Sequence, residues 1–314
     1  MDGTPGLRVL CPAAVNSLEH PLVLVNPSAG GGRAGRVRAD VEAYWREQGV
    51  TASFLVPESP EETRRLAADA ERQGYSCIIA LGGDGTIHEV INGVAGSVMT
   101  VGVLPAGGGN DLARALGMPL DPIDAAHALL SAIPGRIDLL QLRDAAGRTC
   151  VYAGAGGAGI DAEAAQLANT RFRYLPGIAR YAAAAVAAYH GARPLLVRLE
   201  ADGVPHQFTA HLVAVANTPS YGSGVRIAPA ARIDDGLMDL AIVAPLVWTQ
   251  VLDGLLLALR DGDIRWPEMR RLRARTLRLE TDRPALFHGD GEVLGETPVG
   301  IEVLPKNLQV LVPR

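Results

Sequence analysis

Residues 78–94 read IIALGGDGTIHEVINGV, a stretch that joins an apolar run to a helical pattern through a glycine-rich turn. The apolar residues 78–81 suit a strand that is buried on both faces. Glycine-rich turns that open a helix commonly bind phosphate, because glycine lets the backbone approach closely and the helix N-terminus is positively polarised. Asp84 stands at the centre of this turn. A carboxylate beside phosphate requires a bridging cation such as Mg²⁺, or a role in proton transfer.

The same succession of strand, turn and helix occurs on both sides of this stretch. Apolar runs at 21–25, 51–56 and 100–104 are each followed by a turn and a segment with helical spacing. This alternation predicts a parallel sheet flanked by helices, and hence an α/β domain over residues 20–135. Residues 1–19 are expected to form an N-terminal extension.

Two helix starts are marked by residues with capping-box spacing. Ser59 stands three residues before Glu62, and Thr86 stands three residues before Glu89. We therefore expect one helix after Ser59 and another that begins at Thr86. His88 is then expected on an exposed helix face.

Three glycine-rich loops follow predicted strands in this domain, at 26–35, 82–85 and 105–109. The carboxyl ends of parallel strands meet at one edge of a sheet, where ligands bind in α/β proteins. The three loops should therefore lie close together and form one anion-binding site.

The second half of the chain has a different pattern of short, strand-like runs separated by turns. It predicts a mostly β, antiparallel sandwich domain over residues 136–304. Helices are expected at about 160–168, 177–190 and 246–260. The last apolar run, about 305–314, is a candidate to return to the first domain.

Composition excludes several classes of protein. A formal net charge of −5 and a pI near 5.8 argue against nucleic-acid binding. The single lysine, Lys306, lies outside any G-x-x-x-x-G-K-[ST] motif, which excludes a P-loop NTPase. The three cysteines are scattered, which indicates a reducing compartment without disulfides or a zinc site. With no signal peptide and no long apolar run, the sequence predicts a cytoplasmic protein without a transmembrane segment.

Five blocks of sequence together resemble the diacylglycerol kinase catalytic-domain family, which includes bacterial soluble lipid kinases, sphingosine kinase and ceramide kinase. They occur in the order and spacing of that family, from about residue 20 to the end of the chain. The resemblance implies a first domain similar to NAD kinase and phosphofructokinase. The blocks are NPSAG (26–30), GGDGTIHEVINGV (82–94), LPAGGGNDLAR (104–114), RIDDGLMDL (232–240) and DGE (290–292).

The resemblance implies a kinase that transfers the γ-phosphoryl group of ATP to a lipid hydroxyl, with diacylglycerol as the first candidate and phosphatidic acid as product. Such an enzyme would associate transiently with a membrane surface, and a homodimer is a further possibility. ATP would bind between the domains. The implied nucleotide-binding residues are Asn26, Pro27, Ser28, Ala29, Gly30, Gly82, Gly83, Asp84, Gly85, Thr86, Ile87, His88, Glu89, Gly107, Gly108, Asn110 and Glu292.

The resemblance also implies the catalytic and metal-binding residues. Asp290 is the expected proton acceptor for the lipid hydroxyl, and Asp84 is the alternative. A Mg²⁺ ion would be bound by the Asp235 carboxylate and, through their backbone carbonyls, by Arg232 and Leu237. A second Mg²⁺ would arrive with ATP near Asp84. Taken alone, the Asp-Gly pair at 290–291 is equally a signal for a hairpin turn.

The sequence departs from the family at two nucleotide-binding positions. Gly108 stands where the family usually has threonine, and VPESPEE (56–62) lacks the usual threonine after the second strand. Because one hydrogen bond is worth about 1 kcal/mol net, we expect weaker ATP binding rather than inactivity. Two other functions stay open, an NAD kinase-like enzyme and a catalytically weak lipid- or nucleotide-binding protein.

Overall fold

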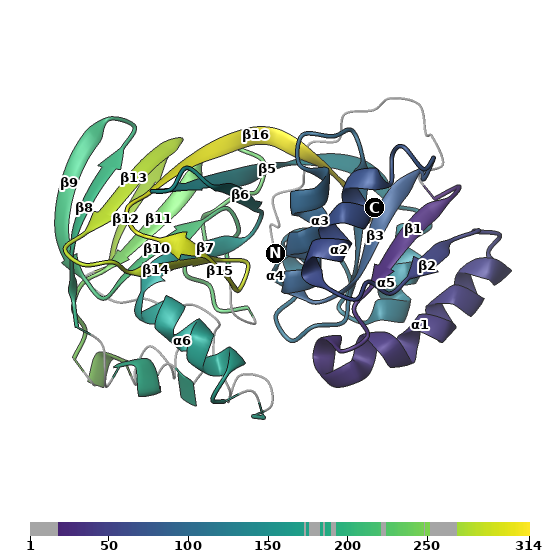
Figure 1. Cartoon of the computed structure of the whole chain (residues 1–314), viewed down its shortest axis with the longest axis horizontal. Coiled ribbons are helices and arrows are strands. Elements are labelled where there is room, and N and C mark those ends of the chain that lie inside the picture. The colour runs from purple at the N-terminus through teal and green to yellow at the C-terminus, as the bar shows by residue number, and fades with distance from the viewer. Residues whose placement is uncertain are drawn as a thin grey trace, which may run out of the picture. The chain divides into compact units, whose positions relative to one another are not determined.

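The computed structural model describes residues 18–172, 174–175, 183–184, 186–189, 193–220, 224–247, 249–251 and 269–314. These residues form two compact units (Figure 1). The first contains the chain up to Asp138 together with Pro305–Arg314, and the second is Leu139–Leu304. The predicted domain limits, 20–135 and 136–304, remain our proposal for the folding units. In the described ranges, no helix combines the length and the apolar character needed to cross a bilayer.

The first unit contains a parallel sheet with the strand order β2-β1-β3-β4. Every residue of β1, β3 and β4 is buried, as expected for parallel strands that are covered on both faces. The strands are β1 (Pro21–Val25), β2 (Ser53–Leu55), β3 (Cys77–Gly82) and β4 (Thr100–Pro105). The helices are α1 (Ala29–Glu47), α2 (Pro60–Asp69), α3 (Asp84–Val94), α4 (Asp111–Ala115) and α5 (Pro122–Leu129).

The strand order reverses at β1. The chain goes from β1 to β2 on one side and then returns to place β3 on the other side. In open α/β sheets, ligands bind at such a reversal, beyond the carboxyl ends of the strands. The turns after Val25 and after Gly82 leave the sheet at this point, so the topology places two of the predicted loops at the expected ligand-binding edge.

The second unit is an antiparallel sandwich. One sheet has the order β12-β11-β10-β7-β14-β15, and the other includes β16-β13-β8-β9. Its elements are β5 (Ile133–Asp144), β6 (Thr149–Tyr152), β7 (Ala155–Gly159), α6 (Ile160–Asn169), β8 (Leu195–Ala201), β9 (Val204–Ala210), β10 (Leu212–Ala216), β11 (Met238–Val243), β12 (Met269–Ala274), β13 (Thr276–Thr281), β14 (Leu286–Gly289), β15 (Glu292–Glu296) and β16 (Val299–Val312). Side chains from both sheets, among them Val197, Val213, Leu279 and Phe287, form the core. The predicted fold class, an α/β domain with a β sandwich, is confirmed.

The last strand, β16, contributes to both units. Residues 299–302 pair antiparallel with β13, whereas Gln309 and Val310 pair parallel with Thr100 and Val101 of β4. The apolar run at the end of the sequence therefore supplies a strand next to β4 in the first unit.

The predicted start of α3 is wrong by two residues. The helix begins at Asp84 with Gly83 as N-cap, and Thr86 lies inside the first turn with a buried hydroxyl. Glu89 pairs with Arg64 at 2.9 Å instead of completing a capping box. His88 is also buried, at 3% exposure, and not on an exposed face. By contrast, the Ser59 cap is confirmed, because its hydroxyl accepts the Glu62 N–H.

The helix prediction for 160–168 is confirmed by α6. The predicted helices at 177–190 and 246–260 fall mostly outside the described residues. Of these two segments, residues 183–184, 186–189, 246–247 and 249–251 are described, and all of them are helical except 246–247.

Candidate functional site

The three glycine-rich loops of the first unit are in direct contact. The Asn26 N–H donates to the carbonyl of Leu81 at 3.0 Å, and the Ala106 N–H donates to the carbonyl of Gly82 at 2.7 Å. Gly30 has a φ of +60°, and a Cβ added there would lie 1.9 Å from the Ala106 carbonyl oxygen. Only glycine fits at this contact, so the sequence of the first loop is constrained by the third.

Asp84 holds the second loop against the third. Its Oδ2 accepts the N–H of Asn110 and its Oδ1 accepts the N–H of Asp111, both at 2.8 Å. These donors belong to the N-terminus of α4, where the helix leaves N–H groups unpaired. The carboxylate is thus stabilised by two amide dipoles. A Cβ on Gly109 would lie 2.4 Å from Oδ2, so only glycine fits beside it.

Asn110 closes the third loop on itself. Its φ is +55°, its side-chain oxygen accepts the Gly107 N–H, and its amide group donates to the Gly107 carbonyl, both at 2.9 Å. The side chain makes no capping bond to α4. Gly108 lies at the tip of this loop, and a Cβ there would have no heavy atom within 4 Å. A larger side chain therefore has room at the position where the family usually has threonine.

The remaining predicted nucleotide-binding residues differ in how they are placed. Ser28 donates its hydroxyl to the Asn26 side-chain oxygen at 2.8 Å, which orders the first loop. The Thr86 hydroxyl is buried without a hydrogen-bond partner in the described part of the chain. Ile87 and His88 are buried, so their side chains do not line an open site. The structure thus brings together residues 26–30, 82–86 and 107–110, and the glycine backbone with a buried hydroxyl suits a phosphate-bearing nucleotide.

In the second unit, Asp290 lies in the turn between β14 and β15. Asp290 and Gly291 have φ values of +52° and +84°, which is the geometry of a tight hairpin turn. The Asp290 carboxylate accepts the N–H of Ala153 at 3.0 Å and that of Gly154 at 2.8 Å. The hairpin interpretation of this block is therefore correct, and the same turn presents a carboxylate in a fixed orientation. Glu292 follows in the same hairpin as the first residue of β15.

Asn217 is a positioning residue that the sequence analysis missed. Its side chain donates to the Ala153 carbonyl, and its own N–H donates to the Gly154 carbonyl, both at 2.9 Å. Asn217 thus fixes the Ala153–Gly154 peptide group, whose N–H donates to Asp290, together with the peptide group that follows it, and Asn217 is completely buried. The signal was a polar pair, Asn217 and Thr218, directly after the apolar strand β10. A polar pair directly after a buried strand is typical of a ligand-binding site.

Two buried side chains lie next in sequence to this arrangement, Tyr152 before the Ala153 donor and His288 two residues before Asp290. Tyr152 is completely buried, and its hydroxyl has no hydrogen-bond partner in the described part of the chain. Burial, and next to it the Asp290 charge, raises the pKa of Tyr152 well above its ordinary value, so the phenol is neutral. His288, two residues before Asp290, is buried in β14 and is not an exposed turn residue.

The predicted metal position centres on Asp235. Its Oδ1 accepts the Leu237 N–H at 3.2 Å, and its Oδ2 forms an ion pair with Arg273. Arg273 also contacts Asp239 at 3.3 Å, while Arg232 pairs with Asp234 at 3.5 Å. Among the described residues, no group of three or more His, Cys, Asp or Glu forms a metal cluster.

Oxygen donors suit Mg²⁺, so the chemistry of Asp235 and the two neighbouring carbonyl groups fits this ion. The positive charge at Asp235, however, is supplied by Arg273. A Mg²⁺ ion at this position would have to displace Arg273 from the carboxylate.

Family models match the chain in two adjacent parts. Residues 20–142 match the diacylglycerol kinase catalytic domain, and residues 154–312 match the YegS C-terminal NAD kinase beta sandwich-like domain. A diacylglycerol kinase of Mycobacterium tuberculosis is 31% identical over 295 residues, covering 93% of this chain and 94% of that protein. The chain belongs to the diacylglycerol kinase catalytic-domain family. The resemblance inferred from the five blocks is thereby confirmed, and membership assigns the chain to the lipid kinases.

One further relative and one solved structure are also similar to this chain. A diacylglycerol kinase of Bacillus subtilis is 27% identical over 300 residues, with 95% of this chain and 97% of that protein covered. A solved structure described as a diacylglycerol kinase of Bacillus anthracis has a TM-score of 0.71 at 20% identity, over 94% of this chain and 97% of that one. At this identity the solved structure supports the two-part fold alone.

Proposed function

We propose that this chain transfers the γ-phosphoryl group of ATP to the hydroxyl group of a lipid, with diacylglycerol as the first candidate substrate. The observation that carries the proposal is the contact between three glycine-rich loops, fixed by Asp84, in a chain of this kinase family. Phosphoryl transfer depends on positioning and on charge neutralisation, which backbone N–H groups and a divalent cation supply. Because the acceptor is a lipid, we further propose transient association with a membrane surface.

We propose that the nucleotide phosphates bind where the first turn of α3 meets the loops at 26–30 and 107–110. The N–H groups at the start of α3 point out of the helix and favour an anion. The buried hydroxyl of Thr86 adds a donor in the same turn. Asp84 holds the second and third loops together beside this turn.

We propose Asp290 as the base for the lipid hydroxyl. Each of its carboxylate oxygens accepts one backbone N–H, which holds the carboxylate in one orientation. A base that is held in one orientation loses little freedom when the hydroxyl arrives. Asp84 has the same number of backbone donors, but they come from another glycine-rich loop, so we assign Asp84 to fixing that loop.

A kinase assay tests these roles. Wild-type protein is expected to transfer label from γ-labelled ATP to diacylglycerol in mixed micelles. Asp290→Asn should lower kcat by about 100-fold or more, the usual range for loss of a general base, and leave the KM for ATP unchanged.

Asp84→Asn should raise the KM for ATP, because its amide group cannot accept both N–H bonds. Glu296→Gln, an exposed acid on β15, is the control and should behave as wild type.

Three results would contradict these assignments. No labelling of diacylglycerol, monoacylglycerol, sphingosine or ceramide would remove the lipid kinase proposal. Labelling of NAD instead would favour the NAD kinase-like alternative. Full activity of Asp290→Asn would exclude Asp290 as the base.

The open space at Gly108 permits a gain-of-function test. Gly108→Thr places a hydroxyl at the position where the family usually has one, without a steric conflict. One added hydrogen bond of about 1 kcal/mol should lower the KM for ATP about fivefold. Gly108→Val has the same shape without the hydroxyl and should give no improvement. An equal effect of threonine and valine would show that the hydroxyl is not used.

We propose that Mg²⁺ binds Asp235 when Arg273 releases it. Arg273→Ala should then lower the Mg²⁺ concentration at half-saturation about fivefold, since an exposed ion pair is worth up to about 1 kcal/mol. The measurement is Mg²⁺-dependent thermal stabilisation, which does not require turnover. Arg271→Ala on the same strand is the control, and Asp235→Asn should abolish the stabilisation. An unchanged midpoint in Arg273→Ala would contradict the competition.

A further inference from the structure

The sequence restricts which side chains can bring positive charge to the proposed phosphate site. Sites of phosphoryl transfer combine backbone N–H groups and Mg²⁺ with a lysine or an arginine that neutralises the phosphates. The chain has a single lysine, Lys306, which lies in β16 and in none of the three glycine-rich loops. The cationic side chains at the site should therefore be arginines, which can bind a phosphate through two parallel N–H groups.

Several arginines of the first unit already have a carboxylate partner. In each of these ion pairs an acid balances the charge of the guanidinium group. The pairs are Arg33 with Asp121, Arg46 with Glu42, Arg64 with Glu89, Arg65 with Glu62, and Arg72 with Asp69.

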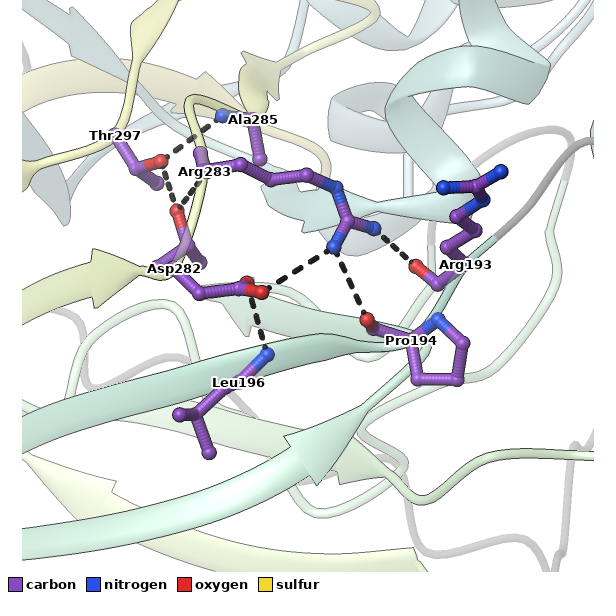
Figure 2. A network of polar contacts seen from close by, with 8 residues as sticks. Arg193, Pro194, Leu196, Asp282, Arg283, Ala285 and Thr297 are labelled. Atoms are coloured by element: carbon purple, nitrogen blue, oxygen red, sulfur yellow. Dashed lines mark hydrogen bonds and ion pairs between the residues drawn. The ribbon is translucent and has the colours of Figure 1, made fainter.

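Arg283 in the second unit shows how an arginine that ties chain segments together is balanced (Figure 2). Its guanidinium group donates to the carbonyl of Pro194 at 3.2 Å and to that of Arg193, and it pairs with Asp282 at 3.5 Å. Asp282 in turn accepts the Leu196 N–H at 3.0 Å. Two backbone carbonyls and one carboxylate thus share this positive charge.

Arg36 has a backbone partner but no carboxylate. Its Nη1 donates to the carbonyl of Gly31, in the first glycine-rich loop, at 3.2 Å. A Cβ on Gly32 would lie 3.1 Å from the same nitrogen, so the guanidinium group lies against the loop. The side chain is exposed, and Arg36 forms no ion pair within the ranges that the structure describes. Its charge is therefore available to an anion that binds at this loop.

Arg114 has the same arrangement at the third loop. It lies in the last turn of α4, and its Nε donates to the Gly109 carbonyl at 3.2 Å. It is also exposed, and no carboxylate in the described part of the chain forms an ion pair with it. The first and third loops touch where Gly30 meets Ala106. Two guanidinium groups without a carboxylate partner thus lie on adjoining loops of the proposed phosphate site.

The backbone of the first loop is open beside Arg36. Gly30, Gly31 and Gly32 have φ values of +60°, +64° and +86°, so the loop makes a left-handed turn. Gly31 is exposed, and a Cβ added there would have no heavy atom within 4 Å. An anion can therefore approach the loop backbone and the guanidinium group of Arg36 together.

We propose that Arg36 and Arg114 bind the terminal phosphate groups of ATP, one from the first loop and one from the third. Each guanidinium group then exchanges a neutral carbonyl oxygen for a phosphate oxygen, which makes a stronger, charge-assisted hydrogen bond. These roles rest on the proposed binding of ATP. They add two residues to the nucleotide-binding set that the family resemblance implies.

The test measures nucleotide binding to the full-length protein by isothermal titration calorimetry, with Mg²⁺ and without lipid. Arg36→Gln and Arg114→Gln should each raise the Kd for ATP about tenfold, as expected for the loss of a hydrogen bond between charged groups. AMP lacks the terminal phosphates, so its Kd should stay unchanged in both variants. Arg46→Gln, near the other end of α1 and paired with Glu42, is the matched control and should bind ATP as wild type.

Two further measurements separate phosphate binding from a role in ordering the loops. Arg36→Lys keeps the positive charge and should retain most of the affinity for ATP. Without nucleotide, both glutamine variants should melt at the wild-type temperature, since substitutions of exposed side chains change stability little. A lower melting temperature together with an equal loss of ATP and AMP binding would overturn the proposal and assign the arginines to loop order.

The remaining outcomes distinguish these arginines from the kinase activity. Wild-type affinity for ATP in either glutamine variant would remove that arginine from the site and leave the kinase proposal standing. The expected loss of ATP binding, together with no labelling of any lipid by the wild-type protein, would support the arginines and contradict the lipid kinase. No binding of ATP to the wild-type protein would overturn both.

Discussion

The hydrogen bonds from the Asn110 and Asp111 amides to Asp84 are the interaction on which the proposed nucleotide site depends. They join the start of α3 to the start of α4, and thereby fix two of the three glycine-rich loops. The acid at the centre of a phosphate-binding turn then has a structural explanation. Its charge is balanced by two helix N–H groups, which leaves the N-terminus of α3 to attract the phosphates.

Most of the fold could be predicted because its signals are local. Apolar runs correctly predicted the parallel strands, and the spacing of Ser59 and Glu62 correctly predicted a helix start. The same spacing at Thr86 and Glu89 failed because long-range partners decide that turn. Glu89 pairs with Arg64 on another helix, and Asp84 binds amides 26 and 27 residues away. A capping box is predictable only where no tertiary partner competes for its side chains.

The candidate site in the second unit was also only partly predictable, because its partners are distant in sequence. Asp290 and its turn were predicted from the Asp-Gly pair and the family resemblance. Its partners Ala153 and Gly154 lie 137 and 136 residues earlier in the chain, and Asn217 binds them from a third strand. No local pattern links these three segments. Arg273 was missed at the metal position for the same reason, because it reaches Asp235 from a neighbouring strand 38 residues away.

Amide hydrogen exchange by NMR tests the central claim most directly. If Asp84 fixes the loops, the N–H groups of Asn110 and Asp111 exchange slowly in the wild-type protein without nucleotide. In Asp84→Ala both should exchange at the rate of an open loop, while the buried amides of β3 remain protected. Rapid exchange of both amides in the wild-type protein, or equal protection in the variant, would contradict the account.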